Sequence, residues 1–191
     1  MILFGYVVGI GVDIGENDVL KLSFQIATPA SSQGTGGSSG GSSSSNNSES
    51  STYIINTVEC NSIDTGLNLI NSHISKNLNL SHCKVIVFSE SLAYQGISEY
   101  LYTLVNKIDL RPDCNVIVSR CSSEYFLQST KPVFEKLASS YYEVSYSSSQ
   151  YTGYVANLKL EDFFNSITDT YSEAYAILRW CNNRTNKKRY E

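Results

Sequence analysis

The sequence predicts an α/β fold: a mixed β-sheet of about five strands with helices packed on it. Two apolar runs, at 84–88 and 115–119, each follow a polar lead-in, and a helical pattern at 92–108 lies between them. Strand, helix, strand is typical of a parallel pair buried on both faces. Residues 20–28 alternate apolar and polar side chains, which indicates a strand with one buried face.

The first strands form a hairpin. Strands are expected at 4–14 and 20–28, and the turn between them contains Gly, Asn and Asp, which tolerate a positive φ. Pro29 ends the second strand. Residues 31–51 are almost entirely Ser and Gly, so they bury too little apolar surface to offset their ordering entropy. We therefore expect a long disordered loop between strands two and three, the third strand lying at 53–58.

Spaced apolar residues predict the helices. Asn61 or Ser62 is a candidate N-cap for a helix with an apolar stripe from Ile63 to Leu78, and the second helix covers 92–108. Three further helices are expected. They are a short one capped by Ser122 or Ser123, one at 133–141 that follows Pro132, and a last one at 158–167.

Composition excludes several classes of protein. The net charge of −4 gives no field that favours nucleic acid, so no nucleic-acid partner is expected. No apolar stretch reaches the ~18 residues that span a bilayer. The apolar N-terminus lacks a basic segment and a small-residue cleavage site, so it is interpreted as a strand and not a signal peptide. The chain as given is expected to be soluble.

The cysteines and tyrosines each allow two interpretations. None of the five Cys forms a CxxC pair, which argues against a zinc ribbon or a thioredoxin site, and buried free thiols are favoured over disulfides. Several of the 14 Tyr lie between residues 141 and 154. They are interpreted as half-exposed strand positions, the alternative being a partner-binding surface.

The segment from Gly9 to Gly15 is the first candidate for chemistry. As a dinucleotide loop it has the wrong glycine spacing, and a strand follows where a helix should start. It fits the Asp-x-Gly phosphate hairpin of actin-like ATPases better, with Asp13 and Gly15 binding ATP and magnesium. However, Glu16-Asn17-Asp18 replaces the expected Thr or Ser. The simpler interpretation is a glycine-rich strand and turn.

The remaining candidates are isolated. His73 and His82 have a poor spacing for a metal site, and His82 is expected to fix a strand entry through hydrogen bonds. Glu90 follows a predicted strand, where it is either catalytic or a favourable charge at the start of the next helix. No set of Ser, His and acid is identifiable. We therefore predict no catalytic residue, no cofactor and no metal, and a binding or assembly role over an enzyme.

The two lead-ins carry a resemblance. Ser81-His82-x-Lys84 with Glu90, followed by Arg111-Pro112 before a strand, resembles the C subunit of spore nutrient-germinant receptors, the Ger(x)C family. The first strands and the Ser/Gly gap are similar to that family in the same order, up to residue 178. The residues that carry the resemblance are Gly9, Gly11, Asp13, Pro29, Ser81, His82, Lys84, Glu90, Arg111 and Pro112.

The resemblance implies a function. Family members are lipoproteins on the outer face of the spore inner membrane. Together with two membrane-embedded partner subunits, they form the receptor that starts germination. The resemblance therefore implies that residues 1–178 are the amino-terminal domain of a non-catalytic receptor subunit. The alternatives are an actin-like nucleotide-binding fragment, or a generic envelope-binding domain.

Two departures from the family concern the ends of the chain. The first Cys is Cys60, inside the domain, so the lipid-carrying Cys is missing and this chain is expected to lack the anchor. Residues 179–191 carry five of the 14 basic residues. A back-translation of this tail, read one base out of frame, resembles a continuation of the family. We hypothesise that the tail is an out-of-frame ending, which the coding DNA tests.

Overall fold

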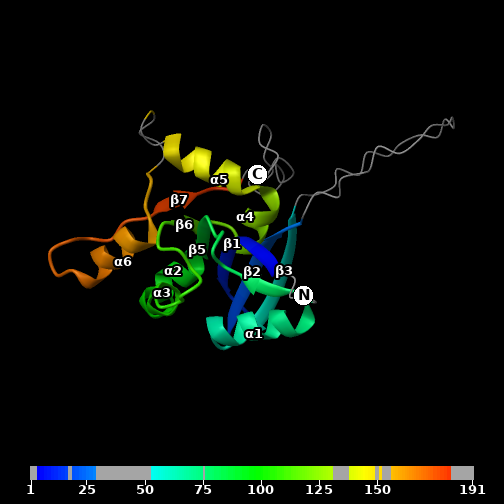
Figure 1. Cartoon of the computed structure of the whole chain (residues 1–191). Coiled ribbons are helices and arrows are strands. Elements are labelled where there is room, and N and C mark those ends of the chain that lie inside the picture. The colour runs from blue at the N-terminus through cyan, green and yellow to red at the C-terminus, as the bar shows by residue number, and fades with distance from the viewer. Residues whose placement is uncertain are drawn as a thin grey trace, which may run out of the picture.

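The computed structural model describes residues 4–16, 19–28, 53–74, 76–130, 138–148, 151 and 156–181. A mixed β-sheet lies between two groups of helices (Figure 1). The strands are β1 (Phe4–Ile14), β2 (Leu20–Ala27), β3 (Tyr53–Cys60), β4 (Asn77–Asn79), β5 (Val85–Ser89), β6 (Asn115–Ser119) and β7 (Ile177–Arg179). The helices are α1 (Ile63–His73), α2 (Glu90–Gln95), α3 (Ser98–Val105), α4 (Ser123–Ser129), α5 (Ala138–Ser147) and α6 (Leu160–Thr168).

The sheet combines a hairpin with a parallel half. Its strand order is β3-β2-β1-β5-β6-β7, and β4 pairs with β1 off this path. β1, β2 and β3 are antiparallel neighbours, whereas β5, β6 and β7 continue from β1 in parallel. The predicted mixed α/β fold and the parallel pair of β5 and β6 are therefore confirmed. The two short strands β4 and β7 were not predicted.

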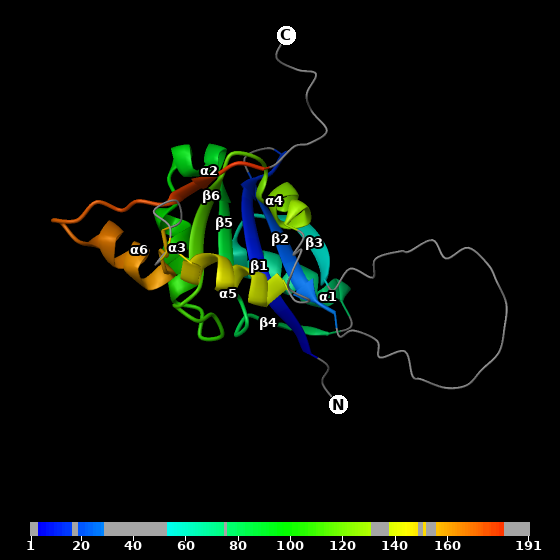
Figure 2. The ribbon, with the colours of Figure 1, turned by 90° about the horizontal axis from the view of Figure 1, so that it is seen from above.

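Each face of the sheet has its own core. The larger cluster packs α1, α2, α3 and α6 on one face, with Ile10, Ile86 and Phe88 pointing into it. The smaller cluster lies under α4 and α5, and Val85 and Val87 point into it. Figure 2 shows α5 crossing over the strands on this second face. Alternate residues of β5 thus serve opposite cores, which is why the strand reads as a continuous apolar run.

The first predicted helix is too long. α1 begins as expected at Ser62, whose side chain accepts a hydrogen bond from Thr65 N, but it ends at His73. Ile74 is extended, and the amide of Leu78 donates to Asn71 Oδ1 at 2.9 Å. Residues 77–79 form β4 against β1 instead. The spacing of Ile74 and Leu78 matched a helical stripe, although Leu78 packs as a strand residue.

The second predicted helix is two helices. α2 ends at Gly96, whose φ of 106° lies in the region that favours glycine, and α3 starts at Ser98. Leu92 and Leu104 are buried as predicted. Ile108 was predicted on the same buried stripe, and this is wrong because α3 ends at Val105 and Ile108 is 100% exposed.

The tyrosine-rich segment is helical. Tyr142 and Tyr146 lie four residues apart on α5 and are 0% and 2% exposed, so the interpretation as half-exposed strand positions is wrong for them. Tyrosine favours strands, but this spacing puts both rings on one helix face. The start of the helix predicted at 133–141, the loop at 31–51, Pro29, and residues 182–191 of the tail lie outside the described residues.

The cysteines divide into two groups. Cys60, Cys83 and Cys114 are buried free thiols, as predicted. Cys121 and Cys181 are paired in a disulfide, so the expectation of free thiols is wrong for these two. Each follows a parallel strand by two residues, and β6 and β7 are neighbours, which brings the Cα atoms to 6.3 Å. That separation is within the range of a disulfide.

Candidate functional site

The Gly-x-Gly-x-Asp sequence of β1 is a seat for α4. Gly9, Gly11 and Asp13 alternate along the strand and so share one face. A Cβ on Gly9 would lie 3.0 Å from Leu127 Cδ2, and a Cβ on Gly11 would overlap the side chain of Ser123. The glycines therefore allow the close approach of α4 to the sheet.

Asp13 holds the start of the same helix. Its carboxylate is 4% exposed and accepts three hydrogen bonds from Ser123, from the amide at 2.9 and 3.0 Å and from the hydroxyl at 2.6 Å. The amide of Glu124 adds a longer contact of 3.4 Å. A carboxylate at a helix N-terminus satisfies amides that have no partner inside the helix. Asp13 is thereby used to fix α4 on β1, which is a structural task.

A hollow lies at the carboxyl edge of the parallel strands. Its volume is about 250 Å³. It is lined by residues at the ends of β1, β5 and β6 and at the starts of β2 and α2. Ligands of open α/β sheets bind at this edge, so the hollow is the first place to look for a binding site. The lining residues are Asp13, Ile14, Lys21, Ser89, Ser91, Arg120, Cys121 and Ser122.

The two basic side chains that line this carboxyl-edge hollow form ion pairs with acidic residues of the domain. Lys21 Nζ lies 2.8 Å from Glu124 Oε2, and this hydrogen bond raises the pKa of Lys21. Arg120 Nε lies 3.7 Å from Glu90 Oε2. Glu90 is the first residue of α2, so the interpretation as a favourable charge at a helix start is confirmed. The hollow thus has two cations whose nearest anions belong to the domain itself.

Ser81, His82 and Lys84 lie at the opposite, amino edge of the sheet. Ser81 donates through its amide to Asn79 Oδ1 at 2.9 Å, which closes the turn before β5. His82 is exposed, and its ring lies edge-on to the ring of Tyr6 with the centroids 4.8 Å apart. The hydrogen bonds expected of His82 are not made to residues that the structure describes. The turn is therefore fixed by neighbouring side chains, and His82 binds no metal group among the described residues.

Lys84 joins three strands through its backbone. Its amide donates to Val8 O at 2.8 Å, and its carbonyl accepts from Asn115 N at 2.9 Å. Its ammonium group lies 3.7 Å from Glu143 Oε2 on α5. The position thus links β1, β5 and β6 at the point where the parallel half of the sheet begins.

Arg111 and Pro112 form the corresponding entry to β6. The Arg111 carbonyl accepts from Cys114 N at 3.5 Å, and the Pro112 carbonyl accepts from Glu161 N at 3.2 Å. The second bond ties the entry to the first turn of α6. The two lead-ins are therefore neighbours at the amino edge, because β5 and β6 pair from Val85 and Asn115 onward. Asp13 and Glu90 lie at the opposite, carboxyl ends of these parallel strands.

The free thiols near these lead-ins, Cys83 and Cys114, are expected to be unreactive. Burial raises the pKa of Cys83 to about 12 and also raises the pKa of Cys114. A thiol in this state is a poor nucleophile and a poor metal ligand. Within the described ranges, no group of three or more His, Cys, Asp or Glu side chains is placed to hold a metal ion.

The match to a known family covers the domain just described. The family model for the spore germination protein N-terminal domain matches residues 4–178. The chain belongs to this family. No curated protein and no solved structure gives a significant match. The germination-family domain starts with the first residue of β1 and ends within β7, so it includes β1 to β6 and the first two residues of β7. The resemblance drawn from the lead-ins is confirmed, and the protein has a part in spore germination.

Sequence reasoning missed the partners within this germination-family domain. Ser123 was identified as a cap but not as the partner of Asp13, and Arg120, Glu124 and Cys181 were not selected. The positions of these residues depend on which strands are neighbours in the sheet. The pattern of a single sequence does not reveal the order of the strands. Among the described helices, none has the length and apolarity to cross a bilayer.

Proposed function

We propose that this domain is a non-catalytic part of a nutrient-germinant receptor, which acts in germination by assembling with membrane-embedded receptor subunits. Family membership supports the role in germination. The placement at the outer face of the spore inner membrane, through a lipid anchor in full-length members, belongs to the same proposal.

The observation that carries the non-catalytic role is the use of Asp13. An actin-like phosphate site needs a carboxylate that faces the nucleotide and its magnesium ion. Here the carboxylate is 4% exposed and accepts from both the amide and the hydroxyl of Ser123. In the two lead-ins, hydrogen bonds or an ion pair within the domain likewise involve Ser81, Lys84, Arg111 and Pro112.

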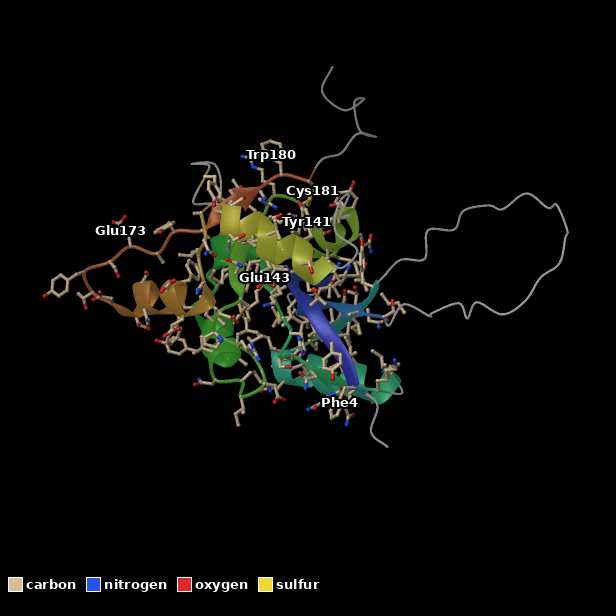
Figure 3. All side chains as sticks on the ribbon, turned by 45° about the horizontal axis from the view of Figure 1, so that its top comes forward. Phe4, Tyr141, Glu143, Glu173, Trp180 and Cys181 are labelled. Atoms are coloured by element: carbon tan, nitrogen blue, oxygen red, sulfur yellow. A yellow bond between two sulfur atoms is a disulfide. The ribbon has the colours of Figure 1, made fainter. Side chains whose placement is uncertain are left out.

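Exposed aromatic side chains beyond α6 support assembly with partners. Three aromatic side chains follow α6 and flank β7: Tyr171 is 97% exposed, Tyr175 is 64% exposed and Trp180 is 71% exposed. Figure 3 shows Trp180 beside α5 and Glu173 on the part of the α6–β7 connection that returns toward β7. Exposed Tyr and Trp are the residues most enriched in the anchoring positions of protein interfaces.

Assembly is tested by co-purification. The chain carrying an affinity tag is co-expressed with the two membrane subunits of a germinant receptor, and the retained subunits are quantified after detergent extraction. We expect retention, and a loss of at least ten-fold for the variant Tyr175→Ser with Trp180→Ser. Tyr94→Ser is the matched control, because Tyr94 is 85% exposed but lies on α2. Equal retention of membrane proteins outside the receptor would favour the envelope-binding alternative.

The nucleotide alternative is tested by thermal shift. A ligand that binds the folded state at 100 times its Kd stabilises that state by about 2.7 kcal/mol. We expect ATP with Mg²⁺ to leave the melting temperature unchanged. A saturable rise that disappears in Asp13→Asn would establish nucleotide binding and contradict the structural role of Asp13.

A further inference from the structure

The disulfide between Cys121 and Cys181 lies at an edge of the sheet. β7 is the terminal strand beyond β6, and it is three residues long. Cys121 follows β6, Cys181 follows β7, and the bond joins positions that are 60 residues apart. In Figure 1 the segment from α6 to β7 runs away from the sheet and returns to it. The bond therefore closes this excursion just after the returning strand.

Among the residues that the structure describes, β7 makes few other contacts. Three residue pairs register it with β6, and Arg179 O accepts from Arg120 N at 3.0 Å. The Arg120 guanidinium lies 4.0 Å from the ring centroid of Trp180. Ile177 and Arg179 are only half-buried, and Leu178 is 43% exposed. The Arg179 guanidinium also lies 5.5 Å from the ring centroid of Tyr146 on α5. Because the apolar burial of β7 is small, the covalent bond adds a substantial constraint to the strand.

The bond is accessible from the carboxyl-edge hollow. Cys121 lines that hollow together with Lys21 and Arg120, and both cysteines are half-buried. Ser119 is 0% exposed, and its hydroxyl lies 3.1 Å from Cys121 Sγ and 3.7 Å from Cys181 Sγ. Since bridged sulfurs carry no hydrogen, the hydroxyl is the donor, and it stabilises a thiolate formed there.

We propose that this disulfide is a thiol–disulfide exchange site that latches β7 to the sheet, and that its reaction partner is a thiol. The inference goes beyond the proposed function and does not rest on it. A thiolate enters through the hollow and bonds to Cys121 Sγ. The bond between Cys121 and Cys181 breaks, and Cys181 departs with the electron pair and takes a proton from solvent. A second thiolate of the reductant then displaces Cys121, which leaves two protein thiols and an oxidised dithiol.

The remaining cysteines provide an internal contrast. Cys60, Cys83 and Cys114 are buried and outside the lining of the hollow. Burial raises the pKa of Cys60, Cys83 and Cys114. In the native chain they are expected to stay unmodified while the latch cysteines react.

The access of the latch is tested on the full native chain with dithiothreitol. After incubation, free thiols are alkylated and located by peptide mass spectrometry. We expect alkylation at Cys121 and Cys181 at least ten-fold faster than at Cys60, Cys83 and Cys114. Ser119→Ala should slow reduction several-fold without changing the alkylation pattern. Reduction that requires denaturant, or equal labelling of all five cysteines, would overturn the proposal.

The release of β7 is tested by amide hydrogen exchange. We expect exchange in the peptide 115–121, which contains the amide of Arg120, to rise at least ten-fold on reduction, while the peptide 85–89 of β5 stays protected. The double variant Cys121→Ser with Cys181→Ser should match the reduced chain and be insensitive to dithiothreitol. If the double variant matches the oxidised chain, the bond does not hold β7 and the latch is refuted.

Discussion

The hydroxyl of Ser123 donates a hydrogen bond of 2.6 Å to Asp13 Oδ2, across 110 positions of the sequence. This contact joins the end of β1 to the first turn of α4. In a sequence that resembles a phosphate hairpin, the carboxylate of Asp13 thus has its partner within the domain. The carboxylate of Asp13 binds the start of α4, and Gly9 and Gly11 leave the space in which that helix packs.

Gly11→Ala is expected to destabilise the fold by about 1–3 kcal/mol, since the added methyl group overlaps Ser123 and pushes α4 away. Urea unfolding measures the loss. Gly5→Ala is the matched control in the same strand, because its Cβ would lie 3.4 Å from the nearest atom, Ile26 Cγ2. Equal losses for both variants would show that β1 tolerates no side chain at either site, and that the seat for α4 is not special.

Asp13→Ala is expected to cost about 1.5–3 kcal/mol, because hydrogen bonds to a charged group are lost and the Ser123 amide loses its acceptor. A double-mutant cycle with Ser123→Ala isolates the hydroxyl contribution, for which a coupling energy of about 0.5–3 kcal/mol is expected. A variant that keeps full stability but no longer retains the receptor subunits would instead place Asp13 in an interface.

The spacing of apolar residues in the sequence was enough to predict that helices pack on both faces of a sheet. The continuous apolar run of Val85–Phe88 indicated a strand buried on both faces, and both cores confirm it. The same reasoning failed where one pattern fits two structures. Leu78 continued a helical stripe and lies in β4, and tyrosines favoured a strand although Tyr142 and Tyr146 lie on one helix face.

The candidate site was less predictable than the fold. Asp13 lies near the end of β1 and Glu90 directly follows β5, but their partners Ser123 and Arg120 come from later segments. The pairing of Cys121 with Cys181 also depends on β6 and β7 being neighbours. Local pattern determines an element, whereas such contacts follow only from the order of strands in the sheet.

Ile86→Ala is expected to cost about 2–5 kcal/mol, because the side chain is 0% exposed in β5 and its removal leaves a cavity. Ile54→Ala is the control on the edge strand β3, where the side chain is 52% exposed and a loss below about 1 kcal/mol is expected. The midpoints of urea denaturation report both. Similar midpoints for the two variants would contradict the central position of β5.

Stability is expected to fall as the pH rises above about 9, and Cys83 provides one identifiable part of that loss. Burial raises the pKa of this thiol from 9.0 to about 12 in the folded chain. Between these values the unfolded chain has lost the proton and the folded chain keeps it, so the folded state binds more protons and stability decreases with pH. Below pH 9 both states are protonated, and the contribution is fully present.

The slope contributed by one such group is about 1.4 kcal/mol per pH unit. Urea unfolding at pH 7.5, 9 and 10 is compared for the native chain and Cys83→Ala, with slopes compared instead of absolute stabilities because the variant also loses packing. The native curve should fall more steeply between pH 9 and 10. Parallel curves would mean that the Cys83 thiol ionises equally in both states, which is incompatible with a thiol that is 1% exposed.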